Sequence, residues 1–357
     1  MRLRQDRISS EERLEALLNY RKPDRIPISI LYLIEFSARN SGYSRALSYN
    51  DPEKSFYSQV GTAEQFGWDK IPLHMGHTLL GALDFGGEIQ IPESDYQQGV
   101  IIKSYPVKTE DDIAKLKLPD RKIAGRIPKA KEFARLQEKH GLPPWFFSRS
   151  PFTMASNMCG LQQFCRWTLK RPELCHEMME RALAHILNVI GDWVDTFGTD
   201  KLMVYISSPS ESNQVISPKQ FEKFALPYHS RFHEGLQAMG IKRFMFHICG
   251  EQTLNLPYLA EVSAWPHPSI LSFGHEVDLE VAAKYFPEDI IYGNIEPAVI
   301  QTGSPQQIYE LCRLAIEKGR KAQGGFILGT GCALPVTSPP LNVFALTKTV
   351  NDFGWYE

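Results

Sequence analysis

The residue types in this sequence that are best suited to chemistry are an imidazole and two thiols. His247 and Cys249 close an apolar run that begins at Arg243. Because side chains alternate along a strand, His247 and Cys249 are expected to point to the same side. An imidazole and a thiol in this arrangement suit a transition metal, with zinc first. Alone, the pair is a weak signal, because a histidine and a cysteine lie this close by chance in many proteins.

A third candidate ligand, Cys332, follows the last apolar run in a loop that also holds Gly329 and Gly331. Glycines allow a tight turn there and let the thiol approach a shared centre. Together with His247 and Cys249 it would give zinc three ligands and leave one position for substrate, as in catalytic zinc sites. The long interval along the chain excludes a local zinc finger, so the ligands must come from different loops.

Three carboxylates near the ends of apolar runs are candidates for proton transfer. They are Asp69, Glu276 and Glu296. Each is predicted to act as a general base or to hold His247 through a hydrogen bond. A solvated or helix-capping role stays open for every one of them.

Two histidines and one amide are candidates for contact with a cofactor. His74 and His77 follow the second apolar run, and Asn294 lies in the segment Gly293-Asn-Ile-Glu-Pro297. If the apolar runs are strands of one sheet, these side chains face the same edge as His247. For the histidines, an ordinary polar loop position remains the alternative.

Eight apolar runs, most of them separated by helical stretches, must position these residues. Strands alternating with helices indicate a parallel sheet, and eight of them in this length predict a single (β/α)8 TIM-type barrel over residues 1–357. An open doubly wound sheet is the competing architecture. Active sites of such barrels lie at the carboxyl ends of the strands, where His247 is expected. The eight runs cover residues 26–31, 70–73, 145–148, 201–206, 243–247, 270–273, 290–293 and 325–328.

Helix signals and one insertion complete the predicted fold. Ser9 and Glu12 have capping-box spacing at the start of an N-terminal helix, and residues 172–197 have a helical apolar period. Further helices are predicted to begin at Ser217-Pro218 and Ser304-Pro305. Residues 78–120 read as a small antiparallel insertion between the second and third barrel strands.

Composition narrows the classes of protein that this chain can belong to. The 357 residues include 39 basic and 41 acidic side chains, without the basic excess of a general nucleic-acid binder. The sequence has no apolar run long enough to span a membrane and no signal-peptide pattern at its start. Six cysteines are too few for a disulfide scaffold, so they are expected to be reduced thiols in a cytoplasmic protein.

Several short motifs, taken in order and spacing, resemble the uroporphyrinogen decarboxylase superfamily over nearly the whole chain, and within it the cobamide-dependent methyltransferases. The motifs are Lys22-Pro-Asp-Arg-Ile-Pro27, Pro151-Phe-Thr153, Ser217-Pro218 with Leu226-Pro-Tyr228, His247-Ile-Cys-Gly250, His275-Glu-Val-Asp-Leu279, Gly293-Asn-Ile-Glu-Pro297 and Gly329-Thr-Gly-Cys-Ala-Leu-Pro335.

The resemblance implies a (β/α)8 barrel and a zinc site made of His247, Cys249 and Cys332. It also implies that a methyl group passes between a small molecule and the cobalt of a cobamide, which a separate corrinoid protein carries. The small molecule would be a thiol, ionised at the zinc, or a methoxylated aromatic compound, whose ether oxygen the zinc would polarise. Some relatives add a carboxylate as a fourth zinc ligand, and the aligned position here is Gly274.

The decarboxylase branch of the superfamily needs no metal and holds its substrate through an arginine-rich motif after the first strand. The corresponding stretch here, residues 31–43, keeps one arginine, Arg39. One guanidinium cannot neutralise the many carboxylates of a porphyrinogen, which weighs against decarboxylation. Tyr32, Phe36 and Arg39 are predicted to contact substrate, although Tyr32 and Phe36 also suit ordinary barrel core. A decarboxylase or metal-free lyase, and a silent corrinoid or porphyrin carrier, are the alternatives.

Overall fold

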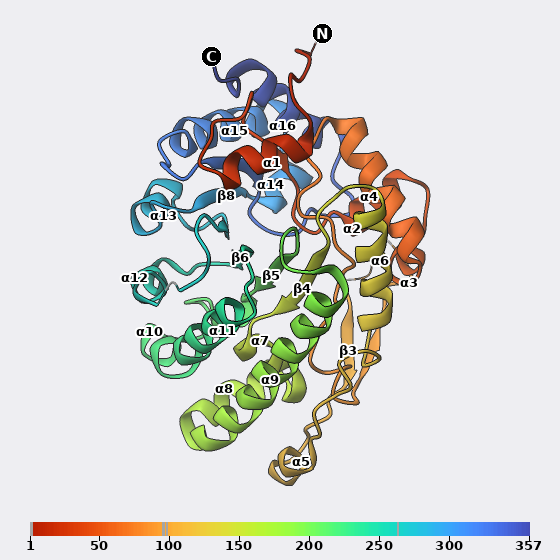
Figure 1. Ribbon diagram of the computed structural model, residues 1–357, viewed down its shortest axis with the longest axis vertical. Helices are drawn as coiled ribbons and strands as arrows, with labels where there is room; N and C mark the ends of the chain where they lie inside the picture. The colour runs from red at the N-terminus through yellow and green to blue at the C-terminus, as the bar shows by residue number, and fades with distance from the viewer. Residues whose placement is uncertain (1–2, 95–96, 98, 263) are drawn as a thin grey trace.

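A parallel sheet of seven strands, in the order β1-β9-β8-β7-β6-β5-β4, forms the centre of the computed structural model. The structure describes residues 3–94, 97, 99–262 and 264–357. Figure 1 shows the strands surrounded by helices, in a curled, TIM-barrel-like α/β arrangement. The strands are β1 (Ile28–Ser29), β4 (Trp145–Arg149), β5 (Met203–Ser207), β6 (Arg243–Ile248), β7 (Ile270–Phe273), β8 (Ile290–Ile295) and β9 (Phe326–Thr330).

The predicted second barrel strand, residues 70–73, is wrong as a strand: this segment forms a turn between β1 and β4. It still takes the eighth place, because the Asp69 amide donates to the Ile28 carbonyl (2.7 Å) and Ile71 packs in the barrel interior. Pro72 has no N–H to give to a neighbouring strand, which explains why regular pairing fails here. The barrel-type fold itself is confirmed.

Alternation along the strands separates two apolar layers. One alternate set faces the barrel interior and the other packs against the helices, as expected for a closed sheet. Helix α1 (Ser10–Leu18) contributes Leu14 and Leu17 to the interior cluster and so covers the amino end of the barrel. The interior cluster includes Leu31, Trp145, Phe147, Met203, Tyr205, Met245, Ile270, Ile290, Tyr292 and Ile327.

The helices begin where the sequence signals predict. Ser9 and Glu12 form the capping box of α1, and α9 spans Pro172–Phe197. The remaining α-helices are α2 (Ile34–Asn40), α3 (Arg45–Asn50), α4 (Pro52–Phe66), α5 (Glu110–Lys115), α6 (Ile127–Lys139), α7 (Pro151–Cys159), α8 (Leu161–Lys170), α10 (Pro218–Gln220), α11 (Leu226–Ala238), α12 (Leu256–Glu261), α13 (Leu279–Tyr285), α14 (Pro297–Thr302), α15 (Pro305–Gly319) and α16 (Pro340–Phe353). Two short 3-10 helices, η1 (Pro209–Glu211) and η3 (Thr253–Asn255), and one π-helix, η2 (Phe221–Ala225), complete the helical elements.

The predicted antiparallel insertion is present. Strands β2 (Glu88–Gln90) and β3 (Ile101–Ser104) pair antiparallel in a sheet of their own. In Figure 1, α5 lies at the end of the molecule opposite the two chain termini, and β3 lies between it and the barrel. The insertion therefore extends away from the barrel rather than adding to its sheet.

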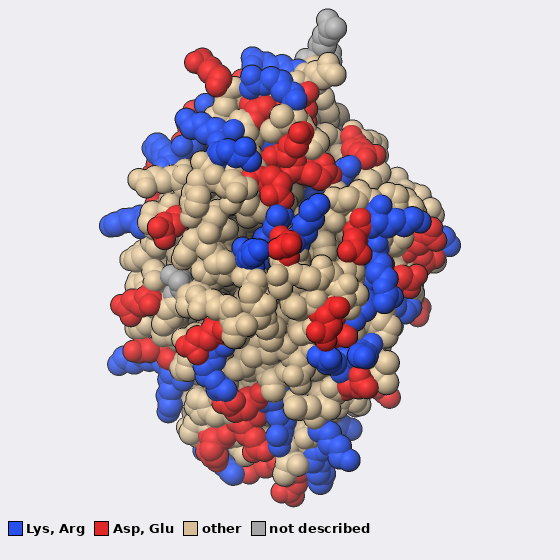
Figure 2. Space-filling model, in the orientation of Figure 1, with Lys and Arg blue, Asp and Glu red and all other residues tan. Residues whose placement is uncertain are grey.

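The surface carries charges of both signs. On the face shown in Figure 2, basic and acidic side chains alternate without a large region of one sign. Within the described part of the chain, none of the helices combines the length and apolar character needed to cross a lipid bilayer.

Candidate metal centre

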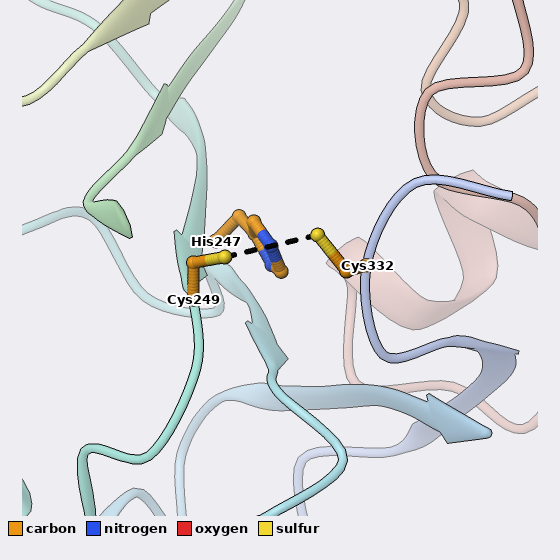
Figure 3. A group of neighbouring side chains, drawn as sticks. All are labelled: His247, Cys249 and Cys332. Carbon is orange, nitrogen blue, oxygen red and sulfur yellow. Dashed lines mark hydrogen bonds between the residues drawn. The ribbon is translucent and has the colours of Figure 1, made fainter. Parts of the chain in front are cut away.

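Three side chains from two distant parts of the chain meet at the carboxyl ends of the strands. His247 lies in β6, Cys249 follows the end of β6, and Cys332 follows β9. Their ligand atoms all lie within 4.8 Å of one another, and the two sulfur atoms are 3.8 Å apart. Figure 3 shows the imidazole beside the line that joins the two thiols. This arrangement places one nitrogen and two sulfurs around a common point.

The hydrogen bonding of His247 fits a metal ligand. Its Nδ1 lies 3.0 Å from the Ser272 hydroxyl on the neighbouring strand β7, which fixes the ring orientation. Its Nε2 is buried and has no hydrogen-bond partner among the described residues. An unsatisfied polar atom in the interior is costly, so a ligand at this nitrogen is expected. A bound zinc would meet that need, and the donor set of one imidazole and two thiols suits zinc.

The pKa values of the two thiols shift in opposite directions. The hydrogen bond from Cys249 lowers the pKa of Cys332 well below its usual value, and the same bond raises the pKa of Cys249. The nearby His247 also lowers the pKa of Cys332. A thiolate is the form that binds metals, so Cys332 is prepared for coordination before Cys249.

Position 274 cannot carry the carboxylate expected from the resemblance without moving the backbone. A Cβ on Gly274 would lie 2.6 Å from the carbonyl oxygen of Gly250 and 2.7 Å from Oε2 of Glu276. The loops after β6 and β7 therefore touch at this point, and glycine permits their close approach. The Glu276 carboxylate stands next to the space that a side chain at 274 would enter.

Three other predicted site residues, Glu276, Asn294 and Glu296, lie at or just after the carboxyl ends of β7 and β8. His275 bridges two of the predicted carboxylates, with Nδ1 3.3 Å from Glu276 and Nε2 3.9 Å from Glu296. Asn294 donates to the carbonyls of Gly274 (2.9 Å) and Val277 (2.7 Å). Its amide thus holds the loop after β7 against β8.

His74 and His77 lie on the opposite side of the barrel interior, beside Tyr32. The His74 ring stacks on the Phe147 ring, with centroids 4.5 Å apart. It packs edge-to-face against the Tyr32 ring, with centroids 5.0 Å apart. The His77 and Tyr32 centroids are 5.6 Å apart. Burial lowers the pKa of His74 to about 4 and that of His77 well below its usual value, so both rings are neutral at pH 7.

Asp69 is not brought to the site. Its carboxylate pairs with Arg13 (2.5 Å) and Arg25 (2.9 Å) and accepts a hydrogen bond from the Ile28 amide at the start of β1. The amino end of β1 is the end of the barrel away from the metal ligands, which follow strand carboxyl ends. Asp69 is therefore part of a buried ion cluster that holds α1, and the catalytic role expected for it is not supported.

Of the other predicted substrate contacts, Phe36 lies in the outer core and Arg39 lies on the surface. Phe36 packs between α2 and α4, with its ring centroid 5.9 Å from Phe66 and 6.3 Å from Trp68, so it belongs to the outer core. Arg39 is exposed and donates to the Val336 carbonyl (3.4 Å), in the loop that follows Cys332. The direction in which a side chain of a helix points depends on its position in the helical repeat. The rotation of α2 about its axis, which the sequence does not fix, turns Phe36 away from the barrel interior.

Two residues near the site were not predicted from the sequence. Ser272 orients His247, and Arg149 ends β4 beside Tyr32. The signal was available, because Arg149 alternates with Trp145 and Phe147, which face the barrel interior. The same alternation that pairs His247 with Cys249 would have turned Arg149 into the barrel mouth.

Comparison with known proteins adds family evidence to this geometry. Similar sequences include the methylated-thiol–coenzyme M methyltransferase of Methanosarcina mazei, 26% identical over 205 residues. That match covers 57% of this chain and about half (51%) of the relative's length. The methylcobamide:CoM methyltransferase MtaA of Methanosarcina barkeri is 23% identical over 350 residues, covering 96% of this chain and 97% of the relative.

A uroporphyrinogen decarboxylase of Geotalea daltonii is 23% identical over 266 residues, covering 72% of this chain and 74% of the relative. Among solved structures, a methyltransferase from Methanosarcina mazei superposes with a TM-score of 0.80 at 20% identity. It covers 97% of this chain and 99% of that chain, which confirms the fold. The family model described as uroporphyrinogen decarboxylase (URO-D) matches residues 9–353, and the chain belongs to this family, with corrinoid-dependent methyltransferases among its relatives.

Proposed function

We propose that this protein is a zinc-dependent methyltransferase that exchanges a methyl group between a small molecule and the cobalt of a corrinoid protein. The observation that supports the proposal is that the ligand atoms of His247, Cys249 and Cys332 lie within 4.8 Å of one another, with Nε2 of His247 buried and without a hydrogen-bond partner in the described part of the chain. The similarity of the sequence to methylcobamide:CoM methyltransferases also supports methyl exchange with a corrinoid.

The chain's own residues hold and orient the centre. His247 Nε2 and the two thiols would bind the ion, and Ser272 keeps the imidazole in the required orientation. A zinc ion in this site would lower the pKa of a bound thiol or polarise an ether oxygen. Glu276 lies near Cys249, and Glu296 contacts Glu276 through His275, so these carboxylates would accept or return a proton at the edge of the site.

The small molecule would be a thiol or a methoxylated aromatic compound, and the corrinoid would arrive on a separate protein. Tyr32 and Phe147 give the barrel interior an aromatic wall, with ring centroids 5.5 Å apart. His74, His77 and Asn294 are the residues proposed to contact the incoming corrinoid. The neutral state of the two histidines suits hydrogen bonding rather than ion pairing.

Metal analysis of ligand variants tests the proposal. Cys249→Ala and Cys332→Ala are each expected to lose most of their zinc, because a tetrahedral site loses a thiolate ligand. Cys312→Ala removes a buried thiol of α15 and serves as the matched control with full zinc content. Zinc retained by both ligand variants would contradict the site.

A methyl-exchange assay, with methylcobalamin as methyl donor or cob(I)alamin as methyl acceptor, then tests the reaction, and incubation with uroporphyrinogen tests the main alternative. Transfer of methyl from cobalt to a thiol, or to cobalt from a methoxylated aromatic, is expected only with metal bound. Stepwise loss of carboxylates from uroporphyrinogen, without metal, would instead assign the chain to the decarboxylase branch.

A further inference from the structure

Arg149 stands in the same layer of the barrel as the candidate metal ligand His247. Across neighbouring parallel strands, Arg149 is paired with Ser207 and Ser207 is paired with His247. Paired residues of a parallel sheet project to the same face, and the face here is the barrel interior, which holds Phe147 and Tyr205. Neighbouring strands are about 4.8 Å apart, so the backbones at Arg149 and His247 are separated by about 10 Å.

The contacts of Arg149 are all with neutral groups. Its Nη1 donates to the Ser207 hydroxyl (2.6 Å) and its Nη2 to the Tyr32 hydroxyl (3.1 Å). The guanidinium carbon lies 5.7 Å from the Tyr32 ring centroid and 5.4 Å from that of Phe147. Over the described ranges, no carboxylate forms a salt bridge with Arg149. A guanidinium has five N–H donors, so donors remain after these two hydrogen bonds.

In having no salt bridge with a described carboxylate, Arg149 differs from the arginines at the amino end of the barrel. Arg13 and Arg25 are each held by carboxylates, Asp69 among them. At the mouth, a divalent ion with two thiolates has no net charge, so a loaded metal centre would not neutralise Arg149. The half-buried guanidinium thus presents a positive charge at the barrel mouth, with which an anionic ligand can pair.

We propose that Arg149 binds an anionic group, a carboxylate or a sulfonate, on the small molecule that exchanges its methyl group at the metal centre. The planar guanidinium binds such groups through two parallel hydrogen bonds, which orients the molecule as well as attracting it. Arg149 thereby selects acidic substrates and turns their reacting atom toward the metal ligands. The inference rests on the proposed function for the identity of the reaction.

Binding to the cobalt(II)-substituted protein tests this inference without any corrinoid. In one arm the ligands are 2-mercaptoethanesulfonate, 2-mercaptoethanol and 2-aminoethanethiol, which share a thiol and differ in end charge; their binding is followed by cobalt absorption. In the other arm, 4-methoxybenzoate is compared with 4-methoxybenzyl alcohol by calorimetry. The arm with the stronger anion preference identifies whether the acidic molecule is a thiol or an aromatic ether.

The wild-type protein is expected to bind the anionic ligand of at least one arm about tenfold to a hundredfold more tightly than its neutral counterpart. Arg149→Met should abolish this preference and leave binding of the neutral ligand unchanged, while Arg149→Lys should retain part of it. Arg135→Met, at an exposed arginine of α6, is the control and should behave as the wild type.

Equal weakening of anionic and neutral ligands in Arg149→Met, or loss of cobalt from that variant, would show a structural role and overturn the inference. Failure of every anionic ligand to bind would overturn it as well. The proposed function fails separately: an anion preference that depends on Arg149, without methyl transfer either from methylcobalamin to a thiol or from a methoxylated aromatic to cob(I)alamin, contradicts the reaction and leaves anion recognition in place.

Discussion

The hydrogen bond between His247 and Ser272 determines which imidazole nitrogen is available for a metal. Ser272 engages Nδ1 at 3.0 Å, which leaves Nε2 as the nitrogen available to bind a metal. Neither serine nor histidine is unusual in a strand, and the pair arises because β6 and β7 place them in register. A small hydroxyl therefore controls the geometry of the centre without touching the ion.

Replacing that hydroxyl should weaken metal binding without removing a ligand. Ser272→Ala is expected to lower zinc affinity about tenfold to a hundredfold, because the imidazole loses the group that orients it. Competition with a chromophoric chelator measures the affinity. Ser37→Ala, which removes a buried hydroxyl of α2 that donates to the Ile34 carbonyl, should leave the affinity unchanged. An unchanged affinity in Ser272→Ala would show that packing alone orients His247.

Helix α1 is attached to the barrel by buried ion pairs rather than by apolar contact alone. Arg13 reaches Asp24 (2.8 Å) and Asp69 (2.5 Å), and Arg25 reaches Asp69 (2.9 Å). Removing one partner from such a cluster leaves a buried charge without compensation. The cluster closes the amino end of the barrel, so it stabilises the element that faces away from the site.

Asp24 makes this attachment sensitive to acid. Burial alone would raise the pKa of Asp24, but hydrogen bonds from Arg13 and from the Arg7 backbone outweigh it and lower the pKa to about 2, from 3.8. The folded state thus favours the carboxylate, and its contribution is present above pH 4 and lost as pH falls toward 2. Urea unfolding between pH 2 and 5 should show a decline in the free energy of unfolding that is smaller in Asp24→Asn. Equal slopes in both proteins would contradict this assignment.

The close approach of the loops after β6 and β7 predicts that an added methyl group at Gly274 destabilises the protein, whereas one at Gly61, a control site in α4, does not. Gly274→Ala would force its Cβ to 2.6 Å from the Gly250 carbonyl, so it should cost about 1–3 kcal/mol of stability and displace Cys249. Gly61→Ala, in α4 with open space around the new methyl group, should stabilise by about 0.5–1 kcal/mol. Thermal unfolding and zinc content measure both. Full stability and zinc content in Gly274→Ala would show that the loops can separate.

At the scale of the whole molecule, the metal centre joins β6 to the loop after β9, elements far apart in the chain. The unfolded chain does not keep its three ligands within reach of one ion. Zinc should therefore bind the folded state far more tightly and stabilise the entire barrel.

Metal removal should accordingly lower the thermal stability of the protein. At zinc concentrations near one thousand times Kd the gain is about 4 kcal/mol, so a chelator should lower the Tm by several degrees. Cys332→Ala should show little dependence of Tm on zinc. A wild-type Tm that is the same with zinc and with chelator would be inconsistent with a site that exists only in the folded chain.

The sequence by itself determined the local features, because they depend on neighbours in the chain. The capping box of Ser9 and Glu12, the long helix α9 and the strand that carries His247 all follow from short patterns. The barrel class followed from the order of apolar runs. These signals need no knowledge of which strand lies next to which.

Only the tertiary structure decided which of the candidate residues meet. The register between strands brought Ser272 to His247 and placed Arg149 in the same layer, while the folding of α1 over the amino end took Asp69 into an ion cluster. Phe36 turned to the outer core by the rotation of its helix. Register and helix rotation are set by packing between distant segments, so a reading of consecutive residues cannot supply them.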